Sequence, residues 1–160
     1  MNVLRRSSLV LIGFLALCFF VAWTGAQVSP GIAPADWYQL LQKPSWNPPA
    51  WVFGPVWTVL YASMAVAAWL VWRSSGWRDA RFAHTLFAIQ LVLNGVWSQL
   101  FFGMQRVDLA LIEIVVLLLA IVAATAAFFR HSKTAGWLMV PYILWVLFAT
   151  ALNAAIWMLN

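Results

Sequence analysis

The stretch KPSWNPPAWVFGPVWTVLY, from Lys43 to Tyr61, decides how this chain is organised. It holds four of the seven prolines and three of the twelve tryptophans, and it changes from a polar segment into a long apolar one. Asn47 followed by two prolines predicts a helix start, because asparagine can cap free N–H groups and proline fits the first turn. Pro55 removes a backbone hydrogen bond and is expected to bend or loosen this helix. The aromatic rings along it indicate a built site more than a plain membrane anchor.

The composition indicates that the solvent of this chain is lipid. Of the 160 residues, 65% are hydrophobic and only 8% are charged, whereas soluble domains average roughly 25% charged residues. The net charge is +5, but the basic residues lie in short gaps between apolar runs, as juxtamembrane charges do. A nucleic-acid partner is therefore not expected. Cys18 is the only cysteine and lies inside an apolar run, which excludes an internal disulfide and indicates a packing residue.

A membrane-spanning helix needs roughly 20 apolar residues, and five stretches of this chain qualify. They are about residues 8–25, 50–72, 81–102, 107–129 and 135–159. We predict an all-α integral membrane protein, a five transmembrane helix bundle that forms one domain over residues 1–160. The first stretch resembles a signal peptide, but its length and Trp23 favour a retained span.

Lysine and arginine are distributed unequally about these spans. Seven lie at the N-terminus or in the second and fourth connections, and two lie on the other side. Since cytoplasmic segments carry an excess of Lys and Arg, the N-terminus is predicted to be cytoplasmic. The C-terminus and the long first connection then face outward.

The first connection, residues 26–49, has two open interpretations. Pro34 could begin a short helix with apolar side chains on one side. The segment can be a lid over the outer end of the bundle, with Trp37, Tyr38 and Trp46 as its aromatic residues. It can equally be an interfacial helix that lies on lipid headgroups.

Most of the tryptophans are explained by the preference of indole for the membrane–water interface. On the predicted topology nine lie at an interface, Trp51 among them, and three lie inside the bundle. Each of these three lies on a helical stripe with polar, aromatic or small residues. The stripes are Trp57 and Tyr61; Gln90, Asn94 and Trp97; and Tyr142, Trp145, Ala149 and Asn153.

The spacing within each stripe places its residues on one helix face. Amide side chains are costly in lipid, so those of the stripes are expected to face the bundle interior. Taken singly, each amide is explained by an interhelical hydrogen bond. Taken together, the three stripes favour a ligand pocket with aromatic walls and a few polar groups.

Other chemistry is weakly represented in the sequence. Glu113 lies inside the fourth span, where it could be functional or could reach the outer interface or cap a neighbour. His84 and His131 lie near the cytoplasmic ends of their spans, away from the predicted pocket. We find no phosphate loop, metal cluster or catalytic triad, so no cofactor or metal is predicted and conventional catalysis is not expected.

A series of motifs between residues 37 and 153 resembles the translocator protein family, also called TspO/MBR, tryptophan-rich sensory protein or peripheral-type benzodiazepine receptor. The motifs are Trp37-Tyr38, Lys43 to Pro49, Trp57, Leu60-Tyr61, Gln90-Leu91, Asn94, Trp97, Phe101 to Gly103, Pro141-Tyr142, Trp145, Ala149-Thr150 and Leu152-Asn153.

The resemblance implies a five-helix bundle, often dimeric, that binds porphyrins, sterols and benzodiazepine-like drugs between the spans, below the first loop. Trp57 and Trp145 match the pair implicated in contacting protoporphyrin and in its light-dependent breakdown. The cavity positions that match are Trp51, Tyr61, Asn94, Trp97 and Ala149. The run Asn153–Asn160 lacks the tyrosine followed by a basic residue that marks sterol recognition in animal members. This departure argues against high-affinity cholesterol binding through that motif and favours a bacterial member.

We therefore expect a membrane receptor or carrier for porphyrins such as protoporphyrin IX and other flat apolar ligands, in tetrapyrrole transport or stress regulation. One alternative is a light-dependent porphyrin-degrading enzyme that uses Trp57 and Trp145. Another is a structural or regulatory membrane partner whose pocket is only a packed core. The expected partners are a porphyrin or other hydrophobic molecule, lipid and a second copy of the chain. The expected location is a bacterial inner membrane, with the outer membrane as the alternative by family analogy.

Overall fold

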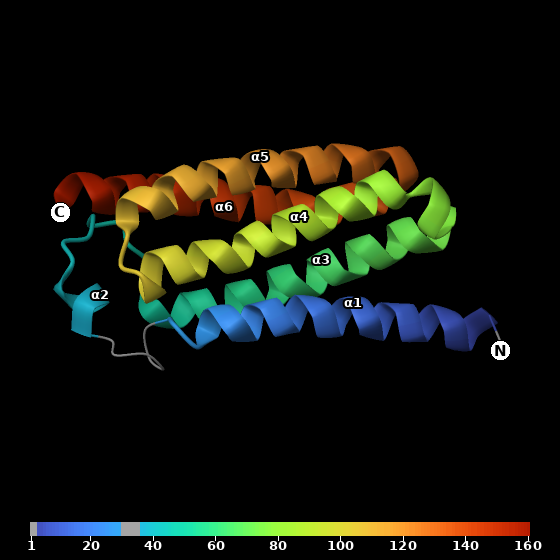
Figure 1. The fold of residues 1–160 in the computed structure, drawn as a ribbon, viewed down its shortest axis with the longest axis horizontal. Coiled ribbons are helices and arrows are strands. Elements are labelled where there is room, and N and C mark those ends of the chain that lie inside the picture. The colour runs from blue at the N-terminus through green and yellow to red at the C-terminus, as the bar shows by residue number, and fades with distance from the viewer. Residues whose placement is uncertain (1–2, 30–35) are drawn as a thin grey trace.

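The computed structural model describes residues 3–29 and 36–160, and the described residues form helices without strands. Five long helices lie side by side as a bundle, and a short helix at residues 36–40 lies in the connection beyond one end (Figure 1). The elements are α1 (Val3–Ala26), α2 (Asp36–Leu40), α3 (Ala50–Asp79), α4 (Arg81–Ser98), the π-helical turn η1 (Gln99–Gly103), α5 (Val107–His131) and α6 (Lys133–Leu159). The five long helices are long and apolar enough to cross a membrane, so the predicted all-α, five-span class is confirmed.

The second span continues beyond its predicted end at residue 72. Its helix reaches Asp79, but the backbone leaves helical dihedrals at Gly76, where φ is 70° and ψ is −175°. Glycine adopts a positive φ without steric cost, so this residue turns the chain toward α4. Pro55 lies inside α3, but the backbone departs from helical dihedrals at Gly76 and not at Pro55.

The prediction that Asn47 caps the second span is wrong. The helix begins at Ala50, the flanking Pro49 is extended (φ −56°, ψ 143°), and no side chain caps the first turn. Pro48 and the extended Pro49 separate Asn47 from the free N–H groups, and its side chain does not cap them. Asn47 Nδ2 instead donates to the carbonyl of Pro48 at 3.1 Å, and Oδ1 accepts from the hydroxyl of Tyr38 at 3.4 Å.

Small residues let the helices pack closely. Ala65, Ala67 and Ala68 of α3 are fully buried in the core, as is Cys18 of α1. Gly136 near the start of α6 has the tightest environment, because a Cβ there would lie 2.4 Å from the ring of Phe129 on α5. The core therefore depends on the absence of side-chain bulk as much as on apolar surface.

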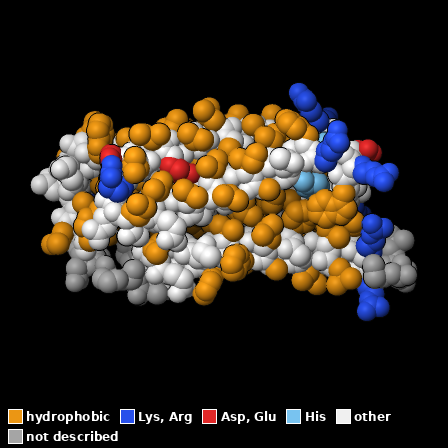
Figure 2. Space-filling model, viewed as in Figure 1, with side chains coloured by type: hydrophobic (Ala, Val, Ile, Leu, Met, Phe, Trp, Pro, Cys, Tyr) orange, Lys and Arg blue, Asp and Glu red, His pale blue; other side chains and the backbone are white. Residues whose placement is uncertain are grey.

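The two ends of the bundle differ in charge. Figure 1 places the start of α1 and the α3–α4 and α5–α6 connections at one end, here called the basic end. The other end, here called the lid end, carries the chain's C-terminus, α2 and the α4–α5 connection. Seven of the nine Lys and Arg residues belong to the segments of the basic end. In Figure 2 most blue side chains gather there, and hydrophobic side chains cover the length between the ends.

A tryptophan-lined cavity at the lid end

A cavity of about 860 Å³ lies at the lid end, between α1, α3, α4 and α6 and beneath the loop that joins α2 to α3. Its volume falls in the range of roughly 300–1,000 Å³ that is usual for small-molecule sites. Aromatic side chains from α3, α4 and α6 form much of the wall, and neutral polar groups are interspersed among them. The cavity is thus mainly apolar with a few polar groups at defined places.

Eight of the ten residues predicted to bind a ligand line this cavity. They are Trp51, Trp57, Tyr61, Asn94, Trp97, Trp145, Ala149 and Asn153. The structure does not bring Gln90 or Tyr142 to the wall, and both are fully buried in the core. Gln90 lies one turn from Asn94 along α4, away from the cavity, with Nε2 3.9 Å from the sulfur of Met64.

A hydrogen-bond network closes the floor of the cavity. The hydroxyl of Tyr61 donates to Oδ1 of Asn94, and Nδ2 of Asn94 donates to the hydroxyl of Tyr142 at 2.8 Å. These residues come from α3, α4 and α6, so the network joins three helices. The indole of Trp57 lies above it, with its centroid 5.5 Å from that of the Tyr61 ring. Asn94 therefore both joins the helices and faces the cavity, and the two interpretations of the buried amides are compatible.

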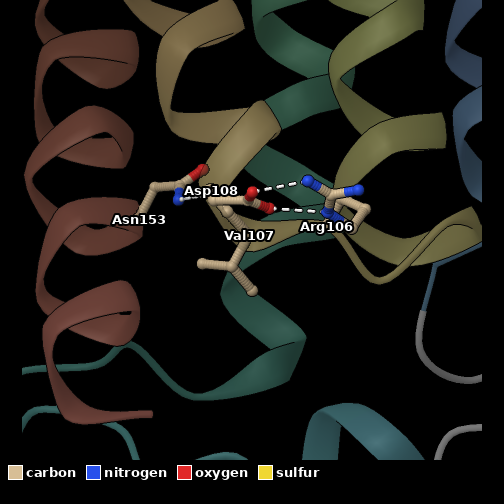
Figure 3. Close-up of polar contacts among 4 residues, drawn as sticks. All are labelled: Arg106, Val107, Asp108 and Asn153. Atoms are coloured by element: carbon tan, nitrogen blue, oxygen red, sulfur yellow. Dashed lines mark hydrogen bonds and ion pairs between the residues drawn. The ribbon is translucent and has the colours of Figure 1, made fainter.

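A second amide holds the wall nearer the lid. Nε1 of Trp97 donates to Oδ1 of Asn153 at 3.2 Å, and Nδ2 of Asn153 donates to the carbonyl of Val107 at 3.0 Å. Figure 3 shows this second bond beside the start of α5, with the ion pair of Arg106 and Asp108 next to it. Because Oδ1 and Nδ2 of Asn153 are both hydrogen-bonded, the amide fixes the orientation of the Trp97 indole.

The π-helical turn shapes the same wall. The N–H of Met104 donates to the carbonyl of Gln99 at 2.7 Å, five residues back, which widens the last turn of the third span. Phe101 and Phe102 both line the cavity from this turn. The ring of Trp97 stacks on Phe101 at a centroid distance of 5.1 Å.

Trp145 completes the aromatic wall from α6. Its ring lies edge-on to Phe53 of α3, at 5.9 Å between centroids, and 5.6 Å from Phe148. Trp57 and Trp145 are both half-buried and reach the cavity from different helices. One ligand in this cavity can therefore contact both indoles.

The segment from α2 to α3 packs on the bundle. The rings of Trp37 and Tyr38 lie edge-on to Phe101 at 5.9 and 6.2 Å, and Trp46 lies 5.8 Å from Phe148. Of the three predicted lid residues, Tyr38 lines the cavity, whereas Trp37 and Trp46 fasten the segment beside it. Pro34 lies outside the described residues. This packing favours the lid interpretation over a helix that lies on headgroups.

Two groups outside the spans have shifted acidities. Burial raises the pKa of the Tyr38 hydroxyl, and the hydrogen bond to Asn47 opposes this shift. The hydrogen bond and charge of Asp108 raise the pKa of Arg106.

A pair of hydrogen bonds ties the lid to the end of α6. The N–H of Gln42 donates to Oδ1 of Asn160, and Nδ2 of Asn160 donates to the carbonyl of Gln42, each at 3.0 Å.

Sequence reasoning missed the contribution of α1 to the cavity. Ala22, Gly25 and Ala26 of α1 belong to the wall, as does Ser29 beyond the end of the helix. At Gly25 an added Cβ would lie 3.0 Å from Oγ of Ser98, so α1 approaches α4 closely at this point. The spacing of Ala22, Gly25 and Ala26, three and four residues, was the available signal, because it places small residues on one helix face. Lys43, which lies on the wall, was also missed as a site residue.

Glu113 does not belong to the cavity wall. Both of its carboxylate oxygens are buried and have no hydrogen-bond partner among the described residues. The carboxylate therefore neither reaches the outer interface nor caps a neighbouring helix. Within the same described part of the chain, no group of three or more His, Cys, Asp and Glu residues could hold a metal ion.

Five membrane-crossing helices with a ligand-sized aromatic cavity under a packed loop define a multi-pass integral membrane protein with an internal binding cavity. The sequence profile of the TspO/MBR family matches residues 14–158, and the chain belongs to this family.

Relatives are found in bacteria, archaea and animals. The chain is 44% identical over 160 residues to the tryptophan-rich protein TspO of Chlorobaculum tepidum, which covers 98% of this chain and 99% of that protein. It is 39% identical over 160 residues to the protein of the same name from Archaeoglobus fulgidus, with coverage of 100% and 99%. It is 41% identical over 123 residues to the translocator protein of Homo sapiens, with coverage of 76% and 73%.

Proposed function

We propose that this protein is a membrane receptor or carrier that binds porphyrins and other flat apolar ligands in the cavity under the lid. The observation that carries the proposal is the meeting of Trp57, Trp97 and Trp145, from three helices, around one cavity of about 860 Å³. Flat conjugated rings gain from stacked and edge-on contacts with indoles beyond the burial of apolar area. The names translocator protein and tryptophan-rich sensory protein, which relatives carry, fit a role in binding and moving or sensing a ligand.

The polar groups of the wall add selectivity to this apolar site. Asn94 and Asn153 are held by bonds to neighbouring helices, so their amides are oriented before a ligand arrives. A preorganised site loses less conformational entropy when it binds. A rigid planar ligand matches such a site better than a flexible chain of equal area.

The proposal is tested by titrating the purified protein in neutral detergent with protoporphyrin IX and following tryptophan fluorescence. Saturable quenching is expected for the native protein. Trp57→Ala combined with Trp145→Ala should weaken binding at least tenfold, about 1.4 kcal/mol, because two walls of the cavity are lost. Trp137→Ala combined with Trp157→Ala is the matched control, since it also removes two indoles but leaves the cavity wall intact.

If the wall variant and the control bind equally well, the cavity is not the porphyrin site. If neither porphyrins nor other flat apolar compounds raise the melting temperature, the pocket is only a packed core and the structural role is favoured. A specific ligand must stabilise the native state by mass action.

A second function is supported by the placement of Trp57 and Trp145 in the same cavity. In this alternative the protein degrades bound porphyrin in light with dioxygen as the oxidant. An indole donates an electron to the photoexcited ring, the reduced ring passes it to dioxygen, and the activated oxygen opens the ring while the indole regains its electron from the ring that is oxidised. Illumination of the complex in air, followed by the porphyrin absorbance, distinguishes it from simple binding. Trp57→Phe with Trp145→Phe should abolish protein-dependent bleaching, and equal bleaching by both proteins would exclude the enzyme.

We also propose that the basic end of the bundle faces the cytoplasm and that the lid faces outward, in a bacterial inner membrane. Seven of nine Lys and Arg residues at one end support this orientation. Modification of single cysteines by an impermeant thiol reagent in intact cells tests it, in a Cys18→Ala background. Arg78→Cys should be protected and Gln105→Cys labelled, and the opposite pattern would reverse the topology.

A further inference from the structure

Lys43 is the one charged residue on the cavity wall among the described residues. It lies three residues beyond α2, within the loop that covers the cavity, and its side chain is half-buried. The other polar residues of the wall are neutral at every depth, including Tyr61 and Asn94 at the floor. The cavity therefore has one positive pole, and this pole lies at the lid.

The ammonium group of Lys43 is held in place by two backbone carbonyls and the face of an aromatic ring. Nζ donates to the carbonyls of Gln39 at 3.3 Å and Leu41 at 3.0 Å, and it lies 4.7 Å from the centroid of the Tyr38 ring. Because a lysine ammonium has three N–H donors, the two carbonyls leave one donor for a further acceptor, and neither they nor the ring carries a negative charge. Among the side chains that the structure describes, which do not include that of Asp36, no carboxylate lies within ion-pair distance of it.

A second cation at the lid end, Arg106, differs from Lys43 because it pairs with a carboxylate of the protein. Arg106 donates to both carboxylate oxygens of Asp108, at 2.9 and 2.6 Å, and lies outside the cavity wall (Figure 3). Its charge is compensated by the protein itself. No described side chain pairs with Lys43 in this way, so its ammonium group is available to a group that enters the cavity.

We propose that Lys43 recognises a carboxylate of the ligand, so that the ligand class is a flat apolar ring system with an acidic edge. The inference rests on the proposed function and sets the direction of binding. The carboxylate points toward the lid and accepts from Nζ, and the ring lies below it among Trp57, Trp97 and Trp145. Charge-assisted hydrogen bonds are stronger than neutral ones, so the free acid is selected over neutral molecules of the same shape.

The test compares protoporphyrin IX with its dimethyl ester, which has the same ring system but no carboxylate. Both are titrated into the full-length protein in neutral detergent by tryptophan fluorescence, and melting temperatures are recorded for each variant. Lys43→Gln should weaken binding of the acid roughly fivefold to tenfold and leave binding of the ester unchanged. Lys43→Arg should keep acid binding within about twofold, because it keeps the charge. Arg106→Gln is the matched control and should leave the binding of both ligands unchanged.

Each result decides between distinct conclusions. Unchanged acid binding in Lys43→Gln overturns the inference but not the proposed function. An equal loss for acid and ester also overturns it, since Lys43 would then act only by packing the lid. Failure of the native protein to bind either compound overturns the proposed function, and this inference with it.

Discussion

The hydroxyl of Tyr61 donates a hydrogen bond to Oδ1 of Asn94, and this contact joins α3 to α4 at the floor of the cavity. The same amide donates to the hydroxyl of Tyr142, so one side chain serves three helices. Lipid offers no alternative partners at this depth, and each group in the network depends on the others for its hydrogen bonds.

Asn94→Leu should destabilise the bundle by about 1–3 kcal/mol, because it leaves buried tyrosine hydroxyls without a partner in the network. Thermal unfolding in detergent measures the loss. Tyr61→Phe should cost less, since Asn94 keeps its bond to Tyr142. A double-mutant cycle between the two positions should give a coupling energy above about 0.5 kcal/mol. Strict additivity would show that the two groups do not interact in solution.

Asn160→Ala should loosen the lid, because Asn160 makes both hydrogen bonds that hold Gln42 to the end of α6. Faster hydrogen exchange at residues 41–43 is expected, with little change in the melting temperature of the bundle. Asn160→Asp is the graded control, since it keeps the acceptor for the Gln42 N–H and loses the donor. Equal exchange in all three proteins would mean that the aromatic contacts alone hold the lid.

Gly136→Ala should be strongly destabilising, because the new methyl group would lie 2.4 Å from the ring of Phe129. Overpacking of this kind costs about 1–3 kcal/mol. Gly13→Ala is the matched control, since a Cβ there meets nothing within 4 Å and lies on the exposed face of α1. Alanine favours a helix interior over glycine, so the control should be neutral or slightly stabilising. Equal melting temperatures would indicate that Phe129 moves aside freely.

Gly76→Ala tests the turn between the second and third spans. The position is open, so the expected cost of about 1–2 kcal/mol comes from the backbone, which has a φ of 70°. Gly76→Asn should cost about as much as Gly76→Ala, because ψ is −175° and the conformation therefore lies outside the left-handed helical region that asparagine tolerates. Both variants should therefore melt below the native protein, and an alanine variant as stable as the native protein contradicts the prediction.

Much of the wall could be predicted because helical periodicity is local. Trp57 and Tyr61 are four residues apart, so they share a face in any α-helix that contains them. The same holds for Asn94 and Trp97, and all four residues line the cavity. The wrong prediction that Asn47 caps the second span also has a local cause. The extended backbone of Pro49 keeps the side chain of Asn47 away from the first turn of α3.

Periodicity does not say how far a helix face is turned toward its neighbours. Tyr142 shares a stripe with Trp145, yet it is fully buried in the core while Trp145 lines the cavity. Gln90 and Asn94 are likewise one turn apart and only Asn94 reaches the wall. The floor network determines where the cavity stops, and it forms only when three helices meet.

The sequence by itself determined that five helices cross a membrane, because a span needs about 20 apolar residues and the chain has five such runs. It also determined the faces of those helices and the unequal charge of the two ends. Only the tertiary structure decided that α1 contributes to the cavity, that Gln42 meets Asn160, and that Lys43 lies on the cavity wall. These features join segments distant in sequence, and packing between helices sets their distances, which no local pattern encodes.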